Sequence, residues 1–205
     1  VKRIVFGECG HAWRVAYSFL NTLAVPWDFL DPRYPVPQHI CEFTHELIKE
    51  GKLKFDKSQN DDMVLTFHDS CNVARATRMG DKPGGQFEIP RAIIKTVCNN
   101  YFDMDEETIR ERTFCCGGGG GLLTDDLMEI RVKGAKPRVE ALNNVMQEKG
   151  VTHMAAICAI CKSQFSKVLP FYGMEMDQIV SVHQLVSNAI ILTGQETGEE
   201  ADEAA

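Results

Sequence analysis

The sequence predicts an α/β fold in which two pseudo-repeated βα halves form parallel-type sheets flanked by helices. Short apolar runs alternate with segments of helical periodicity along the chain, which is typical of a parallel sheet. Two stretches, "KRIVFGECGHAWRVAYSFL" and "THMAAICAICKSQFSKVLPF", share one order: a strand, a cysteine at its end and an amphipathic helix. A loop and a second helix follow in each copy. The two copies therefore indicate related halves with cysteines at strand ends.

The strands are expected where short apolar runs stop at a loop or at a helix start. Four segments meet this description: Lys2–Gly7, Met63–Phe67, Thr113–Cys115 and His153–Ile157. Because the ends of parallel strands meet at one edge of a sheet, groups placed there are expected to lie together.

The helices are expected where apolar residues recur at helical spacing and stop at glycine. One covers Gln38–Lys49 before Gly51, and another has Pro90 in its first turn and runs to about Tyr101. Two further helices flank Gly134 and Pro137, the second ending at Gly150, and the last runs from about Ser181 to Thr193. Trp27–Pro37 and Met79–Gln86, rich in Pro, Gly and Asp, are expected to be loops.

The predicted organisation has three parts. Residues 1–62 are a remnant or first half of the repeat, residues 63–194 are the complete cysteine-rich half, and residues 195–205 are a disordered acidic tail. The formal net charge is −7, and the tail supplies −5 of it through Glu196, Glu199, Glu200, Asp202 and Glu203. The remaining body is not basic, so a nucleic-acid partner is not expected. No run of 18 apolar residues occurs, so no membrane span is expected, and the strand-like start at Val1 suggests a fragment of a longer chain.

Five cysteines form the most informative pattern in the sequence. Cys71 is followed after 43 residues by Cys115-Cys116, and after 41 more by Cys158-Ala-Ile-Cys161. The chain holds 8 cysteines and no export signal, which favours metal ligands or redox groups over disulfides. Three distant segments can therefore deliver five thiolates to one sheet edge.

The pattern favours an iron–sulfur cluster over two alternatives. A structural zinc takes four ligands, which leaves one cysteine over, and adjacent residues of an extended segment point to opposite sides. A thioredoxin-like dithiol at Cys158 and Cys161 leaves the other three unexplained. A cluster several ångströms wide can be held from two directions, and Gly117 to Gly121, beginning with Gly117 and Gly118, can bring backbone N–H groups close to its sulfides.

Other candidates have both a structural and a functional interpretation. Cys9 corresponds to the first cysteine of a pair whose partner is Ala12, and it is a relic, a substrate-facing thiol or an extra ligand. His68 precedes the sequence Asp-Ser-Cys71, where it can donate a proton to a leaving thiolate, hydrogen-bond a cluster sulfide or bind strand-end backbone groups. Cys41 and Cys98 are expected to be structural.

Further residues are weaker candidates. The basic residues near the cysteines can offset cluster charge or attract an anionic sulfur substrate, or simply line an exposed helix face: Lys162, Arg75 and Arg78. His11 and His183 occupy similar places in the two halves. Four aromatic residues are expected to pack the first half: Trp13, Phe19, Trp27 and Phe29.

Several motifs together resemble the CCG cysteine-rich domain family. They are "GECGHAWRVAYSFLNTL", "HICEFTHELIKEG", "TFHDSCNVARATRMGDKPGGQFEIPRAII", "TFCCGGGGGLLTDDLMEIRVKGA" and "ICAICKSQFSKVLPFYG" with "VHQLVSNAI". The family includes heterodisulfide reductase subunits, and the motifs are most similar to its DsrK-type members in membrane complexes of sulfate reducers. The resemblance covers nearly the whole chain except the acidic tail.

The resemblance implies a cofactor and an activity. It implies a noncubane [4Fe–4S] cluster held by Cys71, Cys115, Cys116, Cys158 and Cys161, with ordinary [4Fe–4S] clusters in a missing N-terminal part. It also implies reductive cleavage of a disulfide or trisulfide on a small DsrC-type protein, with electrons from menaquinol through quinol-oxidising membrane subunits. The expected location is cytoplasmic and peripheral on the inner membrane through those subunits. An electron-relay domain without its own substrate and a structural zinc module are the alternatives.

Overall fold

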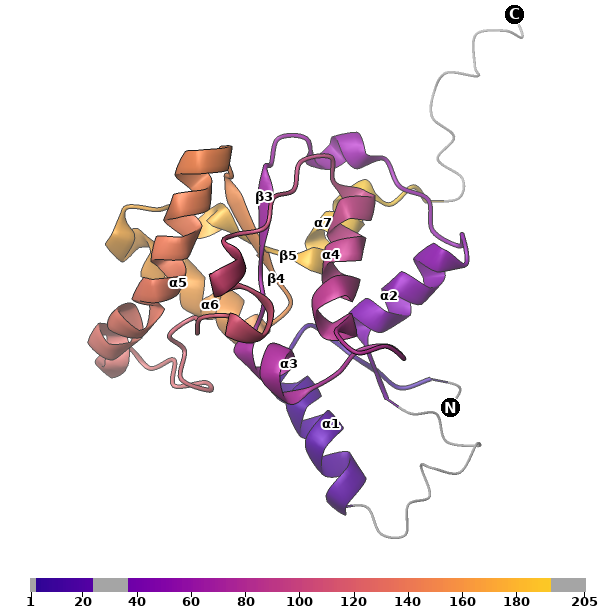
Figure 1. The fold of residues 1–205 in the computed structure, drawn as a ribbon, viewed down its shortest axis with the longest axis horizontal. Coiled ribbons are helices and arrows are strands. Elements are labelled where there is room, and N and C mark those ends of the chain that lie inside the picture. The colour runs from indigo at the N-terminus through magenta and orange to yellow at the C-terminus, as the bar shows by residue number, and fades with distance from the viewer. Residues whose placement is uncertain (1–2, 24–36, 193–205) are drawn as a thin grey trace, which may run out of the picture.

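The computed structural model describes residues 3–23 and 37–192 (Figure 1). Within these residues, two parallel sheets are present. β1 (Val5–Phe6) pairs with β2 (Gln38–His39), and the larger sheet has the order β3 (Leu65–His68), β4 (His153–Ala156) and β5 (Ile179–Ser181). The register pairs His68 with Ala156 and Ala156 with Ser181, so the three strands of the larger sheet end at one edge.

Helices connect and cover these strands. Their bounds are α1 (Gly10–Leu23), α2 (Ile40–Lys49), α3 (Cys71–Ala76), α4 (Gly85–Val97), α5 (Met128–Lys149), α6 (Ala159–Val168) and α7 (Val182–Ala189). Short 3-10 turns lie between them: η2 (Lys57–Asn60), η3 (Glu106–Thr108), η4 (Arg110–Arg112), η5 (Asp125–Leu127), η6 (Leu169–Tyr172) and η7 (Met176–Gln178). The α/β class with parallel sheets flanked by helices is confirmed.

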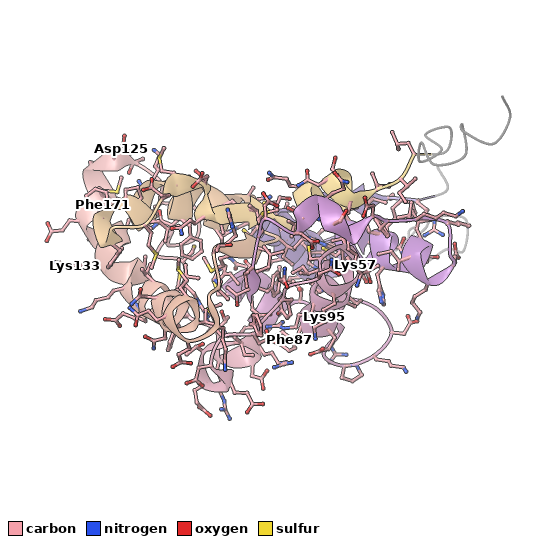
Figure 2. The ribbon with its side chains drawn as sticks, turned by 90° about the horizontal axis from the view of Figure 1, so that it is seen from above. Lys57, Phe87, Lys95, Asp125, Lys133 and Phe171 are labelled. Carbon is pink, nitrogen blue, oxygen red and sulfur yellow. The ribbon has the colours of Figure 1, made fainter. Side chains whose placement is uncertain are left out.

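The larger sheet separates two groups of helices and two hydrophobic cores. Figure 1 shows α5 and α6 on one side of β3–β5, and α4 and α7 on the other. One core joins Phe67, Ile93 of α4 and Leu185 of α7, and the other joins Leu142 of α5 and Phe165 of α6. In the view from above, Asp125, Lys133 and Phe171 are labelled on the α5–α6 side, and Lys57 and Lys95 on the α4 side (Figure 2). All four residues of β3 are buried, as expected for a strand covered on both faces.

The predicted repeat is visible in the order of elements. β1, α1, β2 and α2 follow one another as β4, α6, β5 and α7 do, and each strand pair is parallel. The division at residues 62 and 63 stays a prediction. One hydrophobic core draws Trp13 and Cys41 from before this point together with Ile93 and Leu185 from after it.

Three predictions about individual elements are wrong. Thr113–Cys115 is irregular backbone and not a strand. The two helices expected around Gly134 and Pro137 are one helix, α5, which contains both residues. Gly134 does not interrupt α5. Its missing side chain allows a close approach, because a Cβ on Gly134 would lie 3.3 Å from the Cα of Gly117. Pro90 is not in the first turn of its helix, because α4 already begins at Gly85.

Several predicted boundaries shift by a few residues. Residues 38 and 39 form β2 before α2 begins, α4 ends at Val97 and not near Tyr101, and α7 ends at Ala189 and not at Thr193. The predicted stops at Gly51 and Gly150 are confirmed, and both glycines have the positive φ that favours this residue. Lys2, most of the loop Trp27–Pro37, and the tail 195–205 lie outside the described residues. Within those residues no helix combines the length and apolar character needed to cross a bilayer.

Candidate metal centre

Strand ends deliver the cysteines of the pattern to one place. Cys71 is the first residue of α3, which follows β3, and Cys158 is the N-cap of α6, which follows the neighbouring strand β4. Cys161 lies in the first turn of α6, and Cys115 and Cys116 lie between η4 and the glycine run. β3 and β4 pair in parallel, so Cys71 and Cys158 emerge from the same edge of the sheet.

The five sulfurs form one continuous row. Side-chain hydrogen bonds link Cys71 to Cys115, Cys115 to Cys116, Cys116 to Cys161, and Cys161 to Cys158. All of them are free thiols. Cys116, Cys158 and Cys161 are buried, whereas Cys71 and Cys115 are partly exposed. The end of the row at Cys71 and Cys115 is therefore the side that solvent reaches.

The hydrogen bonds shift the thiol pKa values in alternate directions along the row. The pKa of Cys115 is lowered because Cys116 and Cys71 donate S–H groups to it and backbone N–H groups add to them. The pKa of Cys158 is lowered to about 4, first by the hydrogen bond from Cys161 and then by those from its neighbours. The thiols of Cys71, Cys116 and Cys161 have raised pKa values because each donates to a neighbouring sulfur. The row therefore stabilises the thiolates of Cys115 and Cys158, and the thiolate is the form that binds metals.

The arrangement suits a wide cofactor better than a single ion. Among residues 3–23 and 37–192, no three His, Cys, Asp or Glu side chains converge so that they could hold one metal ion. Each sulfur of the row is hydrogen-bonded to only one or two others of the five, whereas a tetrahedral zinc needs four ligands around one point. The role of the five cysteines as cluster ligands stays a prediction.

The glycine run provides both packing and hydrogen bonds at the site. The backbone N–H groups of Gly117 and Gly118 donate to the Sγ atoms of Cys115 and Cys116, at 3.3 and 3.4 Å. Gly117 has a φ of +85°, and a Cβ there would lie 2.4 Å from the carbonyl oxygen of Arg131. The absence of a side chain at Gly117 thus lets the loop lie directly on α5.

Two arginines of α5 are buried near the thiols, and among the described residues neither is hydrogen-bonded to a carboxylate. Arg138 donates to Met104 Sδ at 3.0 Å and to Thr113 Oγ1 at 2.9 Å, and its Nε has no partner among the described residues. Burial lowers its pKa to about 10. Arg131 donates from Nε to Gln164 at 2.8 Å, while one of its terminal nitrogens is buried without a described partner. Its other terminal nitrogen forms an ion pair with the exposed Asp125 at 3.6 Å.

The nitrogens of Arg131 and Arg138 that lack a partner among the described residues show whether the site fits an iron–sulfur cluster. A buried cation is costly unless an anion compensates for it. A cluster with thiolate ligands is anionic, and its sulfides accept hydrogen bonds. The charges of Asp69 and then of Cys161 act on Arg138, and Arg131 lies where Gly117 packs on α5. The residues present therefore fit the cluster that the sequence implies.

His68 is buried at the end of β3 and has no polar partner in the described part of the chain. Neither ring nitrogen has a hydrogen bond among the described residues, and the ring meets Phe165 edge-on with centroids 5.0 Å apart. Its pKa is lowered well below the usual value, first by burial and then by the charge of Arg138. The structural interpretation, in which His68 binds strand-end backbone groups, is wrong because the ring makes no such hydrogen bond.

The remaining candidates lie outside the row of sulfurs. The Sγ of Cys9 accepts a hydrogen bond from the backbone N–H of Ala12 at 3.5 Å, and Cys41 and Cys98 are buried in the core on the α4–α7 side. Lys162 donates to the buried Glu8 at 2.6 Å, and His183 binds the same carboxylate.

The other basic and aromatic candidates have separate positions. Arg75 donates to the carbonyl oxygen of Thr113 at 2.7 Å, and Arg78 is exposed. Trp13 packs in the first half as expected, against Phe6 and Tyr17. Trp27 and Phe29, and the side chain of Phe19, lie outside what the structure describes.

The first half contributes groups that the sequence reasoning ranked low or missed. The backbone N–H of Gly10 and the side chain of His11 both hydrogen-bond Cys158. A Cβ on Gly10 would lie 2.9 Å from Ser70 Oγ, so the missing side chain favours the close approach of the start of α1. The buried arginines of α5 were also missed, although Arg131, Ala135, Arg138 and Leu142 follow helical spacing on its buried face. That spacing was the available signal.

Comparisons with known proteins agree with this geometry. Residues 65–166 match the CCG family, described as a cysteine-rich domain, and this segment contains all five cysteines of the row. The chain is 36% identical to "Hdr-like menaquinol oxidoreductase iron-sulfur subunit 2" of Archaeoglobus fulgidus, across 94% of this chain and 38% of that protein. A subunit of similar name from Archaeoglobus profundus is 37% identical over the same shares.

More distant relatives carry related names. A "Dihydromethanophenazine:CoB--CoM heterodisulfide reductase" subunit of Methanosarcina acetivorans is 35% identical over 47% of this chain and 23% of its own length. The chain thus spans well under half the length of these curated relatives. They are iron–sulfur or heterodisulfide reductase subunits by name.

Proposed function

Because residues 65–166 of this chain form a cysteine-rich domain of the CCG family, we propose that the chain is the catalytic iron–sulfur region of a heterodisulfide-reductase-like oxidoreductase. In this proposal Cys71, Cys115, Cys116, Cys158 and Cys161 hold a noncubane [4Fe–4S] cluster. The single observation that carries it is the continuous row of five free thiols that three distant segments supply.

The proposed reaction is the reductive cleavage of a sulfur–sulfur bond. One disulfide takes up two electrons and two protons and yields two thiols. A trisulfide takes up four electrons and four protons and yields two thiols and one hydrogen sulfide. The cluster, when bound, supplies the electrons and a site for sulfur. The substrate is a disulfide or trisulfide on a small DsrC-type protein, and menaquinol is the electron source through quinol-oxidising membrane subunits. The names of the Archaeoglobus relatives, which include menaquinol oxidoreductase, support this electron source.

The chain's own residues have distinct tasks in this proposal. The partly exposed Cys71 and Cys115 mark the side from which a protein substrate can approach, while Cys116, Cys158 and Cys161 are shielded from water. Arg131 and Arg138 compensate the negative charge from within α5. His68 is fully buried, and neither ring nitrogen has a hydrogen-bond partner among the described residues, which favours its role as a hydrogen-bond donor to a cluster sulfide over that of a proton donor. Cys9 stays a candidate for a substrate-facing thiol.

The assembly around this region is also proposed. Ordinary [4Fe–4S] clusters in an N-terminal part outside this chain would carry electrons to the site. The larger protein would lie on the cytoplasmic face of the inner membrane, held there by its partner subunits. The length of the curated relatives, of which the chain spans 38%, leaves room for such a part.

A second function keeps the cluster and removes the substrate. As an electron relay, the region would pass electrons between subunits. The partly exposed end of the row at Cys71 and Cys115 favours the catalytic function, because a relay needs no access for a second sulfur. A zinc module is disfavoured because, among the described residues, no three His, Cys, Asp or Glu side chains converge on one point.

A redox titration followed by paramagnetic resonance separates the catalytic function from the relay. The chain is prepared without oxygen and titrated alone, with a reduced DsrC-type protein, and with a DsrC-type variant whose cysteines are replaced by serine. We expect the cluster's signal to change only in the titration with the DsrC-type protein that keeps its cysteines. Identical signals in all three titrations would support the relay, and zinc in place of iron would refute both.

A further inference from the structure

We propose that His11 is a positioning residue that donates a hydrogen bond to the thiolate of Cys158 and thereby sets the cluster's reduction potential. His11 belongs to the half of the chain in which Ala12 stands in place of the second cysteine of the pair. The inference rests on the proposed iron–sulfur centre. His11 Nδ1 lies 3.8 Å from Cys158 Sγ, within the range of hydrogen bonds to sulfur. No cysteine of the first half belongs to the row of sulfurs, so His11 supplies a side-chain contact from that half.

The protonation of the ring follows from its neighbours. Arg14 donates to Asn72 Oδ1 at 2.7 Å, and a guanidinium can only donate, so the oxygen of the Asn72 amide must face it. The Asn72 nitrogen then faces His11 Nε2 at 2.8 Å and donates to it. Since Nε2 accepts, the hydrogen of the neutral ring is on Nδ1, which faces Cys158.

The position of His11 is fixed from several elements. Asn72 belongs to α3 directly after Cys71, Cys158 caps α6, and α1 packs against α3. Gly120 of the glycine run is also near, because a Cβ there would lie 3.8 Å from His11 Nε2. The backbone N–H of the adjacent Gly10 binds the same sulfur. The start of α1 thus presents two donors to Cys158.

The hydrogen bond has a predictable effect on redox behaviour. Reduction adds negative charge that spreads onto the thiolate ligands, and a donor to a ligand sulfur stabilises the reduced state. Removing the donor therefore makes the cluster harder to reduce. We expect at least a tenfold decrease in the equilibrium constant for one-electron reduction, which corresponds to a shift of about 59 mV to lower potential.

The test compares substitutions that keep or remove a donor at the Nδ1 position. His11→Leu removes it, and His11→Asn keeps an N–H₂ group near that position. His11→Gln places its amide near Nε2 instead, facing Asn72. His45→Leu on α2 is the matched control, because His45 belongs to a helix that contributes nothing to the row of sulfurs. Iron content and midpoint potential are measured for each chain.

The expected result is a potential shifted down in His11→Leu and His11→Gln and unchanged in His11→Asn and His45→Leu, with equal iron content. If His11→Leu fails to bind iron, the comparison of the Asn and Gln variants decides in the same way. Equal potentials in all variants, or an equal shift in the Asn and Gln variants, would overturn the role of His11 while leaving the cluster intact. Absence of iron from the unmodified chain would instead refute the proposed function.

Discussion

Gly117 and Gly134 lie in contact across the loop that follows the cysteine pair and the helix α5, where a Cβ on Gly134 would be 3.3 Å from Gly117 Cα. At Gly117 itself a Cβ would meet the carbonyl oxygen of Arg131 at 2.4 Å and the backbone nitrogen of Ala135 at 2.7 Å. The two glycines allow the loop that carries Cys115 and Cys116 to rest on the same helix that supplies the buried arginines. The position of the cysteine pair thus depends on backbone contact.

Replacing Gly117 by alanine should destabilise the protein and displace the cysteine pair. Its φ of +85° disfavours a side chain by about 1–2 kcal/mol, and the clash with α5 adds about 1–3 kcal/mol. Urea unfolding measures the sum. Gly173→Ala is the control, because Gly173 has a φ of +75° with nothing within 4 Å of its added Cβ. Equal losses in the two variants would mean that packing on α5 contributes nothing.

Replacing Arg138 by methionine should lower the midpoint potential of the cluster or its iron content. Arg138 is fully buried, and its hydrogen bonds run to uncharged groups, while Asp69 acts on it only through its charge. Its N–H groups can therefore help to compensate the cluster. Methionine keeps much of the volume and removes the charge. Lys136→Met on the same helix is the control, because the Lys136 side chain is 64% exposed. If both variants keep the wild-type potential and iron content, Arg138 has no electrostatic role at the site.

His39 should make the protein less stable at mildly acidic pH. Burial lowers its pKa to about 4 from an ordinary value of 6.5, despite the opposing charge of Glu8. Between these values the unfolded chain binds more protons than the folded one. Stability is therefore full above about pH 6.5 and falls as the pH drops toward 4, by up to about 3 kcal/mol.

His39→Asn is the variant that tests this assignment. Asparagine can replace the N-cap hydrogen bond that His39 Nδ1 accepts from the backbone of Cys41 at 3.1 Å, and it does not titrate. We expect the difference in urea midpoint between about pH 7.5 and about pH 5 to shrink in the variant. An unchanged difference would assign the acid sensitivity to other groups.

Replacing Glu8 by glutamine should loosen the junction between the two halves. Its carboxylate accepts hydrogen bonds from Lys162 and His183 at 2.6 Å each, and also from Ser181. Burial raises its pKa, but these hydrogen bonds outweigh it and lower the pKa to about 2, so the carboxylate stays charged at neutral pH. Loss of one partner of such a buried pair costs about 3 kcal/mol in free energy of unfolding. The exposed pair of Glu46 and Arg3 provides the control Glu46→Gln, which should change the unfolding midpoint little.

The sequence was sufficient to predict the strands, which follow from local pattern, and their common edge, which follows from the geometry of parallel sheets. The runs around Leu65 and His153 are strands, and their common edge brings Cys71 and Cys158 together. Thr113–Cys115 has a strand-like composition, but its backbone is irregular, because Cys115 and Cys116 turn toward sulfurs of α3 and α6 and have no strand partner. Composition alone does not show that.

Long-range contacts account for what could not be predicted. The sequence around Gly134 is the same whether this glycine ends a helix or allows a helix to lie against another backbone segment. Only the contact with Gly117 shows that the second role applies. The contact of His11 with Cys158 joins residues 147 apart in sequence. No periodicity encodes such a pair.

Iron and acid-labile sulfide in the chain prepared without oxygen, measured for the wild type, Cys116→Ser and Cys98→Ser, test the central claim most directly. Cys116 lies in the middle of the row of sulfurs, whereas Cys98 is buried in the core on the α4–α7 side, where burial raises its pKa to about 12. We predict four irons and four sulfides per chain, as the [4Fe–4S] formula requires, in the wild type and in Cys98→Ser, and loss of the cluster in Cys116→Ser. Equal iron and sulfide in the two variants would contradict the assignment of the five cysteines.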